Sequence, residues 1–318
     1  MKERLNYIDN LRGLLILLVI LGHCIQWIDV NFDHNIIFRY IYSFHMPLFM
    51  FISGYVSYSS NYKWTSIKRR FIQLIVPFVA WSMLSMTLSG NYSLNWLTRP
   101  DTSLWFLWVL FWIGCVHLGL SKLSKQFQIY EEIIILIACI VFLGLLFINK
   151  FSFGFHLFAW YLPFYCAGAI TRKHQSNLFY KLVDFKWLFL LLFIILGYFW
   201  MRQESPTFIN TNSTAIIYFY KFLVGFIGCY TFILFAQMYN YKVLYICELG
   251  GGMTLGIYAI HQFVIKFLIE SHLYDIDCMG LWGQICSIFF MTLILTVFSY
   301  QILSHIPFLS QLFLGKKH

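Results

Sequence analysis

Charged residues are scarce in this sequence, and their scarcity excludes an ordinary soluble protein. Of 318 residues, 11% are Asp, Glu, Lys or Arg, whereas 60% are hydrophobic. Soluble domains carry about 25% charged residues. The composition therefore predicts an integral membrane protein, and no stretch is polar and long enough to form a separate soluble domain. We expect residues 1–318 to form a single transmembrane domain.

The cysteine pattern, the first apolar run and the net charge each exclude a further class of protein or site. The eight cysteines include no C-x-x-C pair and no metal-ligand spacing, so we expect small buried side chains and no metal site. The small residues of a signal-peptide cleavage site are absent after the first apolar run, where His23, Gln26 and Trp27 stand, so this run is expected to remain as a span. The net charge of +9 lies in short loops between apolar runs, which indicates membrane topology and argues against nucleic-acid binding.

Apolar runs of membrane-spanning length recur along the chain. A helix needs about 20 mostly apolar residues to cross a bilayer. The runs cover residues 7–28, 36–58, 71–89, 103–120, 132–149, 155–171, 187–201, 214–238, 248–269 and 281–304. The predicted fold is therefore all-α, a bundle of about ten transmembrane helices.

Basic residues indicate the orientation of this bundle. With the N-terminus in the cytoplasm, the inner segments hold most of the Lys and Arg residues, and the outer segments hold only Arg39, Arg99, Lys150 and Arg202. This bias follows the positive-inside rule and predicts that both termini are cytoplasmic. We expect a multi-pass protein of the cell membrane.

The first span carries ionisable residues that hydrocarbon disfavours. Arg12 and His23 are eleven positions apart, nearly three helical turns, so they share one face roughly 16 Å apart along the axis. Such residues usually face the bundle interior and mark a functional site. A snorkelling Arg and a His bonded to a neighbouring helix are the alternative. Asp9 is expected to pair with Arg12, or to be a first-turn acid favoured by the helix dipole.

Two more histidines are expected at the depth of His23. His45 lies roughly 14 Å from the outer edge of the second span, and His261 about 18 Å from the inner edge of the ninth. Three imidazoles at one level predict a polar cavity, where a neutral imidazole can take a proton from a hydroxyl that attacks an acyl carbon. Structural hydrogen bonding is the alternative for each. Ser53 and Tyr258 are candidates to contact an acyl donor and stabilise its oxyanion.

A basic cluster of Lys68, Arg69 and Arg70 stands directly before the third span. One or two of these charges would suffice as a topology signal. Three together also form a local anion site, because Arg forks suit phosphate. The cluster is predicted to hold the phosphates of a cytoplasmic cosubstrate.

Several stretches resemble a known family. YIDNLRGLLILLVILGH (7–23) is similar to the first-span signature of the integral-membrane acyltransferase family 3, in which an Asp precedes an Arg or Lys and a His follows after ten residues. FHMPLFMFISGY (44–55) resembles the second-span motif, especially in the sugar O-acetylase branch similar to fucose 4-O-acetylase. KRRFIQLIVPF (68–78), SLWFLWVLF (103–111) and LGIYAIH (255–261) resemble further stretches, so the resemblance runs nearly from end to end.

The resemblance implies an O-acyltransferase that moves an acyl group, expected to be acetyl, from cytoplasmic acyl-CoA to a sugar hydroxyl of a lipid-linked or surface glycan. It implies that His23 carries the chemistry, while Arg12 and the basic cluster, chiefly Arg69 and Arg70, serve acetyl-CoA. Implied partners are the glycan, the bilayer and proteins of glycan synthesis. Longer members have a C-terminal extracytoplasmic esterase-like domain that is not found here, so the chain is expected to work alone or pass the acyl group to a partner. General-base and covalent routes through His23 both stay open.

A transporter or flippase for a lipid-linked sugar or polysaccharide is the alternative, because many spans around a polar cavity suit it. No carboxylate lies deep in a predicted span and no internal repeat is evident, which argues against a proton-coupled carrier built from inverted repeats. A facilitator needs neither feature. A membrane scaffold or sensor is a third class, but it gives no reason for Arg12 and His23 to share a face.

Overall fold

The protein is predominantly helical in the part of the chain that its computed structural model describes. The model describes residues 5–58, 65–90, 92–93, 95–100, 104–148, 153–175, 181–203, 214–238, 244–271 and 279–316, and these contain no strand. The helices, with short 3₁₀ and π segments labelled η, are α1 (Asn6–Ile28), η1 (Phe32–His34), α2 (Ile36–Ser57), α3 (Thr65–Arg70), η2 (Phe71–Ile75), α4 (Val76–Ser89), α5 (Asn95–Thr98), α6 (Trp105–Phe127), α7 (Glu131–Ile148), α8 (Phe155–Lys173), η4 (Val183–Phe185), α10 (Lys186–Tyr198), α11 (Thr214–Met238), α12 (Leu244–Glu248), η5 (Leu249–Met253), α13 (Thr254–Glu270), α14 (Leu281–His305) and α15 (Pro307–Leu314).

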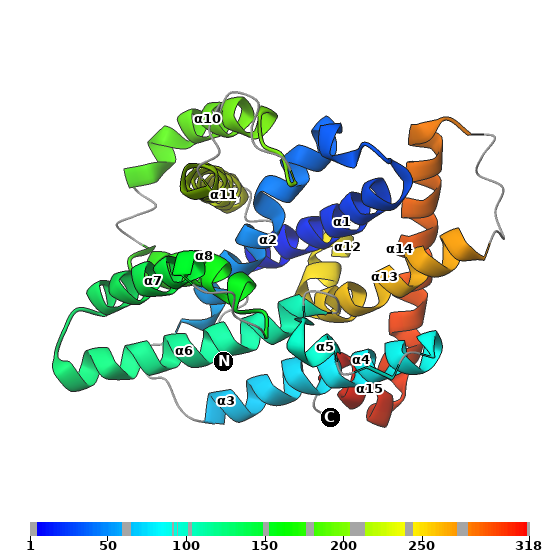
Figure 1. Ribbon diagram of the computed structural model, residues 1–318, viewed down its shortest axis with the longest axis horizontal. Coiled ribbons are helices and arrows are strands. Elements are labelled where there is room, and N and C mark those ends of the chain that lie inside the picture. Colours follow the sequence, from blue (N-terminus) through cyan, green and yellow to red (C-terminus); the bar gives the residue numbers. More distant parts are fainter. Residues whose placement is uncertain are drawn as a thin grey trace. The chain divides into compact units, whose positions relative to one another are not determined.

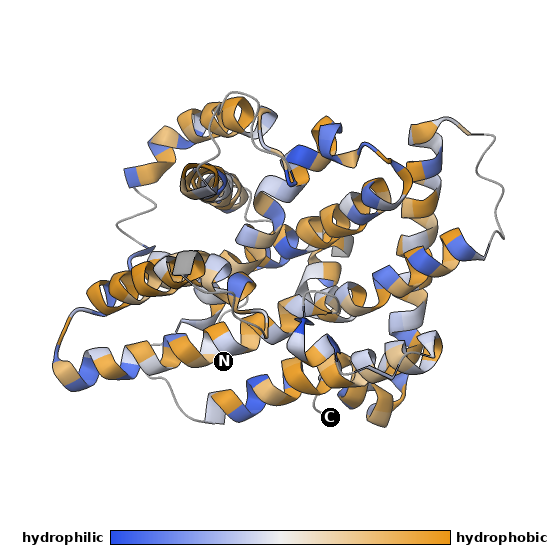
Figure 2. Cartoon of the chain, in the orientation of Figure 1, coloured by the Kyte–Doolittle hydropathy of each residue, from blue (hydrophilic) through white to orange (hydrophobic). Residues whose placement is uncertain are grey.

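Each of the ten predicted spans coincides with a helix or with helices that run on from one another. Within the described residues, seven helices are long and apolar enough to cross a membrane. Figure 2 shows that hydrophobic residues dominate these helices and also α7 and α10. Because a bilayer offers the backbone no hydrogen-bond partner, a spanning segment must satisfy its own peptide groups as a helix. The all-α membrane fold is therefore confirmed, whereas the count of ten spans and the cytoplasmic termini stay predictions.

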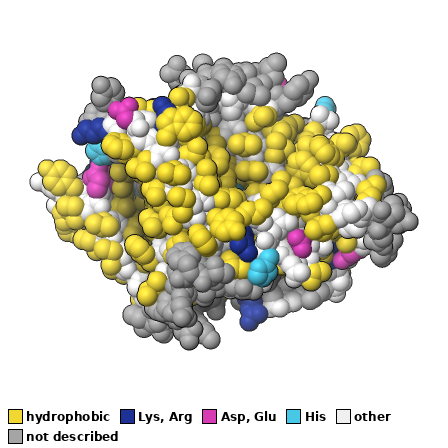
Figure 3. Space-filling view, turned by 90° about the horizontal axis from the view of Figure 1, so that it is seen from above, with side chains coloured by type: hydrophobic (Ala, Val, Ile, Leu, Met, Phe, Trp, Pro, Cys, Tyr) yellow, Lys and Arg dark blue, Asp and Glu magenta, His cyan; other side chains and the backbone are white. Residues whose placement is uncertain are grey.

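The surface of the protein is rich in apolar side chains. Trp187 is 64% exposed, Phe219 71% and Phe298 59%, although all three lie within helices. On the face shown in Figure 3, hydrophobic side chains cover most of the described surface and charged ones are few. Exposed apolar side chains on this scale are what lipid contact requires.

The chain divides into two compact units, residues 1–49 with 175–301 and residues 50–174 with 302–318. In the first unit, α1 packs along α12, η5 and α13, and α10 packs beside α11 (Figure 1). In the second, α6, α7 and α8 pack together, and α4 packs against α15 (Figure 1). The single transmembrane domain expected from composition stays a prediction.

In the first unit, two glycines bring α1 into backbone contact with its neighbours. A Cβ atom at Gly250 would lie 1.7 Å from the carbonyl oxygen of Asp9, and one at Gly13 would lie 2.0 Å from that of Ile246. Atoms cannot approach so closely without a shift of the backbone. Both positions therefore require glycine, and the contact fixes α1 against the segment that leads directly into α13.

The second unit contains an equivalent crossing of α2 and α8. A Cβ atom at Gly54 would lie 1.9 Å from the carbonyl oxygen of Tyr165, and one at Gly168 would lie 1.9 Å from that of Phe51. Small residues at crossing points are the usual device for packing helices in membranes, where the hydrophobic effect does not drive helices together. The crossing sets the depth of Ser53 relative to α8.

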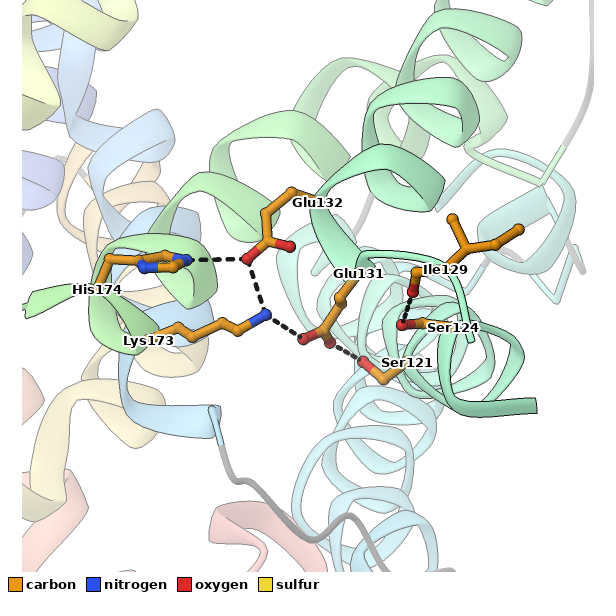
Figure 4. A network of polar contacts seen from close by, with 7 residues as sticks. All are labelled: Ser121, Ser124, Ile129, Glu131, Glu132, Lys173 and His174. Atoms are coloured by element: carbon orange, nitrogen blue, oxygen red, sulfur yellow. Dashed lines mark hydrogen bonds and ion pairs between the residues drawn. The ribbon is translucent and has the colours of Figure 1, made fainter. Parts of the chain in front are cut away.

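Polar side chains gather where α6, α7 and α8 approach one another in the second unit (Figure 4). The Ser121 hydroxyl donates to Glu131, and the Lys173 ammonium lies 3.4 Å from Glu131 and 2.7 Å from Glu132. The His174 ring lies 2.9 Å from the Glu132 carboxylate. Partly exposed pairs of this kind contribute up to about 1 kcal/mol each. They orient the helix ends, and packing of the apolar faces remains the main source of stability.

Candidate functional site

Histidines from three helices of the first unit form a cluster. The ring centroids of His23 on α1 and His261 on α13 are 5.2 Å apart. Tyr42 on α2 links the other pair, with its ring centroid 6.2 Å from that of His23 and 4.8 Å from that of His45. His45 and His261 are buried, whereas His23 is half-buried. The structure thus brings together the three histidines that sequence placed at one depth, with His23 the most accessible of them.

Two of these histidines have their protons fixed by their own helices. Nδ1 of His45 lies 2.7 Å from the carbonyl oxygen of Ile41, and Nδ1 of His261 lies 3.1 Å from that of Ile257. A carbonyl oxygen can only accept a hydrogen bond, so each neutral ring carries its proton on Nδ1 and a lone pair on Nε2. Nε2 of His261 is buried and has no hydrogen-bond partner within the part of the chain that the structure describes. A buried acceptor of this kind can be satisfied by a hydroxyl group of a ligand.

The cluster is contacted by three further side chains, which the sequence analysis did not predict as site residues. The Tyr42 hydroxyl lies 3.3 Å from Nδ1 of His23 and 2.9 Å from Oε1 of Gln26. The side-chain nitrogen of Gln262 lies 3.2 Å from Nε2 of His23. Helical spacing contained a signal for two of them, because Gln26 follows His23 by three residues and Tyr42 precedes His45 by three, which places each on a neighbouring surface of its helix.

A cation also approaches this cluster from the segment after α10. The Arg202 guanidinium lies 4.9 Å from the centroid of the Tyr42 ring. The backbone of this segment is held by the buried carboxylate of Asp33, which accepts the N–H of Arg202 at 2.6 Å and that of Gln203 at 2.8 Å. Lys221 donates to the Arg202 carbonyl at 2.9 Å. Sequence treated Arg202 only as one of the few outer-loop charges.

The remaining site candidates of the first unit lie on α1 and α13. Asp9 is buried one turn before Arg12, which is half-buried. The pairing of the two side chains stays a prediction. The ring of Tyr258 lies 5.9 Å from that of His261, and Tyr258 is 9% exposed. Tyr258 therefore borders the cluster from the same helix as His261.

The basic cluster lies in the second unit, and its three members differ. Lys68 and Arg69 are exposed on α3, whereas Arg70 is half-buried and donates to the Tyr165 hydroxyl at 3.0 Å. A Cβ atom at Gly114 would lie 1.9 Å from Nη1 of Arg70, so this glycine leaves the room that the inward guanidinium needs. The π segment η2 follows at once and joins α3 to α4. Such segments are frequent at functional sites.

Ser53 also belongs to the second unit, where it is half-buried on α2. Among the described residues, no group of three or more His, Cys, Asp or Glu side chains is placed to hold a metal ion. The catalytic and donor-binding roles assigned to these residues from sequence stay predictions.

The helices and the histidine cluster define a multi-pass membrane protein with polar side chains inside its spans. The chain belongs to the integral-membrane acyltransferase family 3, whose match, described as an acyltransferase domain, covers residues 5–301. The family resemblance inferred from the first-span and second-span motifs is therefore confirmed, whereas the sugar O-acetylase branch stays a prediction.

Two curated relatives share part of the chain. Nodulation protein NolL of Sinorhizobium fredii (strain NBRC 101917 / NGR234) is 33% identical over 190 residues, which cover 53% of this chain and 50% of the relative. Nodulation protein NolL of Mesorhizobium japonicum (strain LMG 29417 / CECT 9101 / MAFF 303099) is 28% identical over 233 residues, which cover 65% of this chain and 59% of the relative. The chain thus spans between 50% and 59% of the length of these relatives. No solved structure matches it.

Proposed function

We propose that this protein is an O-acetyltransferase of the cell membrane that moves an acetyl group from cytoplasmic acetyl-CoA to a sugar hydroxyl of a lipid-linked or cell-surface glycan. The family supports acyl transfer. The observation that carries the chemistry is the half-buried His23 inside α1, beside the unpartnered Nε2 of His261. A base next to a vacant hydrogen-bond acceptor is what activation of a hydroxyl group requires.

In the direct route, His23 takes the proton of the acceptor hydroxyl through Nε2 while the hydroxyl oxygen bonds to the thioester carbon. The carbon–sulfur bond then breaks, and His23 returns the proton to the leaving thiolate, so that an ester and a free thiol are formed. His261 accepts a hydrogen bond from the acceptor and orients it, and the buried ring of His45 lies beside Tyr42. In the covalent route, Nε2 of His23 attacks the thioester carbon and the CoA thiolate leaves. The acceptor hydroxyl then attacks the acyl-imidazole and gives its proton to the departing ring nitrogen, so that the ester forms and His23 is regenerated.

The donor requires cations because CoA carries several phosphate groups. The exposed guanidinium of Arg69 and ammonium of Lys68 are suited to phosphate oxygens, and Arg70 reaches inward beside them. Arg12, which Asp9 is proposed to orient, supplies a further cation on the helix of His23. Ser53 and Tyr258 are the hydroxyl groups proposed to contact the donor and its oxyanion.

Replacing Arg69 by alanine tests the donor site. Loss of one charge-assisted hydrogen bond is expected to raise the KM for acetyl-CoA about tenfold and to leave kcat nearly unchanged, because the phosphates are bound equally before and during the reaction. The measurement is steady-state release of free CoA thiol by purified protein at varied acetyl-CoA.

Lys125→Ala is the matched control, because Lys125 is an exposed cation in the last turn of α6 in the same unit. Its donor KM should stay within about twofold of wild type, because the loss of one exposed charge away from the proposed phosphate site changes the binding of the donor little. An unchanged donor KM in the double variant Lys68→Ala/Arg69→Ala would remove the phosphate-binding role from the basic cluster.

A further inference from the structure

We infer that Tyr42 and Gln26 are positioning residues for His23, which hold its neutral ring with the proton on Nδ1 and the lone pair on Nε2. The inference rests on the proposed function for its catalytic meaning, because only a lone pair on the accessible nitrogen lets His23 accept a proton from a hydroxyl. The tautomer itself can be measured whether or not the protein transfers acetyl groups.

The single proton of the Tyr42 hydroxyl group fixes the direction of its hydrogen bonds. Its hydroxyl group has one proton and lies 2.9 Å from Oε1 of Gln26, an atom that only accepts. The proton of Tyr42 therefore points to Gln26. Towards Nδ1 of His23, 3.3 Å away, the same oxygen can then only accept, so Nδ1 must carry the proton of the ring.

A contact on the opposite side of the His23 ring leads to the same tautomer. The amide nitrogen of Gln262 lies 3.2 Å from Nε2 of His23, and an amide nitrogen only donates. Nε2 of His23 therefore accepts and holds a lone pair. Two contacts from different helices, α2 and α13, lead to the same tautomer. In the resting protein the Gln262 amide occupies the lone pair, and the acceptor hydroxyl takes its place.

The Tyr42 ring is itself held in place by its neighbours. Phe38 stacks on it with centroids 4.0 Å apart, and the Arg202 guanidinium lies 4.9 Å from its centroid. Arg202 is in turn held through its backbone by the buried Asp33. Tyr42 is thus supported from its own helix and from the segment after α10, as an orienting residue must be if the catalytic ring is to stay in one geometry.

The chemical consequence concerns the charged intermediate. When Nε2 takes the proton of the acceptor, the ring becomes an imidazolium ion and its Nδ1–H bond to Tyr42 becomes charge-assisted. This bond is stronger with the charged ring than with the neutral one, so it stabilises the transition state more than the resting state. Tyr42 therefore acts on kcat through His23, without contact to the donor.

Tyr42→Phe is the direct test, because it removes the hydroxyl and keeps the ring. We expect kcat to fall about 10–100-fold while the KM for acetyl-CoA stays near its wild-type value. Tyr40→Phe is the matched control on the same helix, since its hydroxyl donates only to the carbonyl of Ile194, at 2.6 Å. Its kcat should stay within about twofold of wild type.

Gln26→Glu tests the direction of the hydrogen bonds that run from His23 through Tyr42 to Gln26. A carboxylate at this position can only accept from Tyr42, so kcat should stay within about fivefold of wild type, whereas Gln26→Met, which has no acceptor of that strength, should behave like Tyr42→Phe. Loss of activity in Gln26→Glu equal to that in Gln26→Met, in variants of wild-type thermal stability, would overturn the assigned direction.

Nitrogen-15 NMR of histidine-labelled protein in detergent gives a readout that does not depend on catalysis. The His23 signal, assigned by its loss in His23→Ala, should show a protonated Nδ1 in wild type and lose that preference in Tyr42→Phe. A proton on Nε2 in wild type, or an unchanged tautomer in Tyr42→Phe, would overturn the inference. A confirmed tautomer in a protein that transfers no acetyl group would contradict the proposed function and leave the positioning of His23 established.

Discussion

Replacing His23 by alanine is expected to lower the kcat of acetyl transfer by roughly 10²–10⁴-fold, the usual contribution of a general base. The ring accepts from Gln262 at Nε2 and lies beside the vacant Nε2 of His261. Alanine leaves neither a proton acceptor nor a nucleophile, so both the direct and the covalent routes stop. The measurement is single-turnover transfer of radiolabelled acetyl from acetyl-CoA to glycan.

His156→Ala is the control for His23→Ala, since His156 is exposed on α8 in the other unit. We expect it to retain wild-type activity. Both variants should insert into the membrane and elute as the same species as wild type in size-exclusion chromatography. Acetyl transfer at the wild-type rate by the His23→Ala protein would exclude this residue as the catalytic base.

Replacing Gly250 by alanine is expected to lower the free energy of unfolding by about 3 kcal/mol or more, at the upper end of what overpacking costs. The added Cβ would lie 1.7 Å from the Asp9 carbonyl oxygen, so α1 and η5 must move apart. Because α1 carries His23 and η5 leads into the helix of His261, the same shift should separate the two rings and reduce acetyl transfer. Thermal unfolding in detergent measures the first effect, and turnover the second.

Gly252→Ala is the matched control two residues further along η5. A Cβ atom there meets nothing within 4 Å. Because alanine favours helix over glycine by about 1 kcal/mol, this variant should be as stable as wild type or slightly more so. Equal stability of the two alanine variants would show that α1 and η5 are not in backbone contact.

The spans could be predicted from sequence because hydropathy and the demands of the bilayer leave few choices. Each apolar run had to become a helix, and each one did. The π segments η2 and η5, which lie at the beginnings of the third and ninth predicted spans, could not be predicted. An extra residue in a helical turn depends on tertiary contacts, such as the approach of Gly250 to the Asp9 carbonyl. Hydropathy does not predict such contacts.

The site could be predicted only as far as single ionisable residues reveal it. His23, His45 and His261 stand out because imidazoles are rare in hydrocarbon, and their depths follow from counting residues along helices. Tyr42 and Gln26 are uncharged, so they do not stand out as the histidines do. Spacing places them on surfaces next to His45 and His23, but their contact with the cluster depends on which helices meet.

The basic cluster shows the same limit in another form. Spacing alone does not tell which of Lys68, Arg69 and Arg70 turns inward. The structure shows that it is Arg70, whose guanidinium reaches Tyr165 through the room that Gly114, on a different helix, leaves free.

The most direct test of the account is acetyl transfer by the purified protein in liposomes that contain a glycolipid extract, with radiolabelled acetyl-CoA on the side of the basic cluster. We expect base-labile label in the glycolipid fraction with wild type and almost none with His23→Ala. Absence of label with several acyl-CoA donors, together with counterflow of a lipid-linked sugar by the same liposomes, would contradict acetyl transfer and establish a transporter instead.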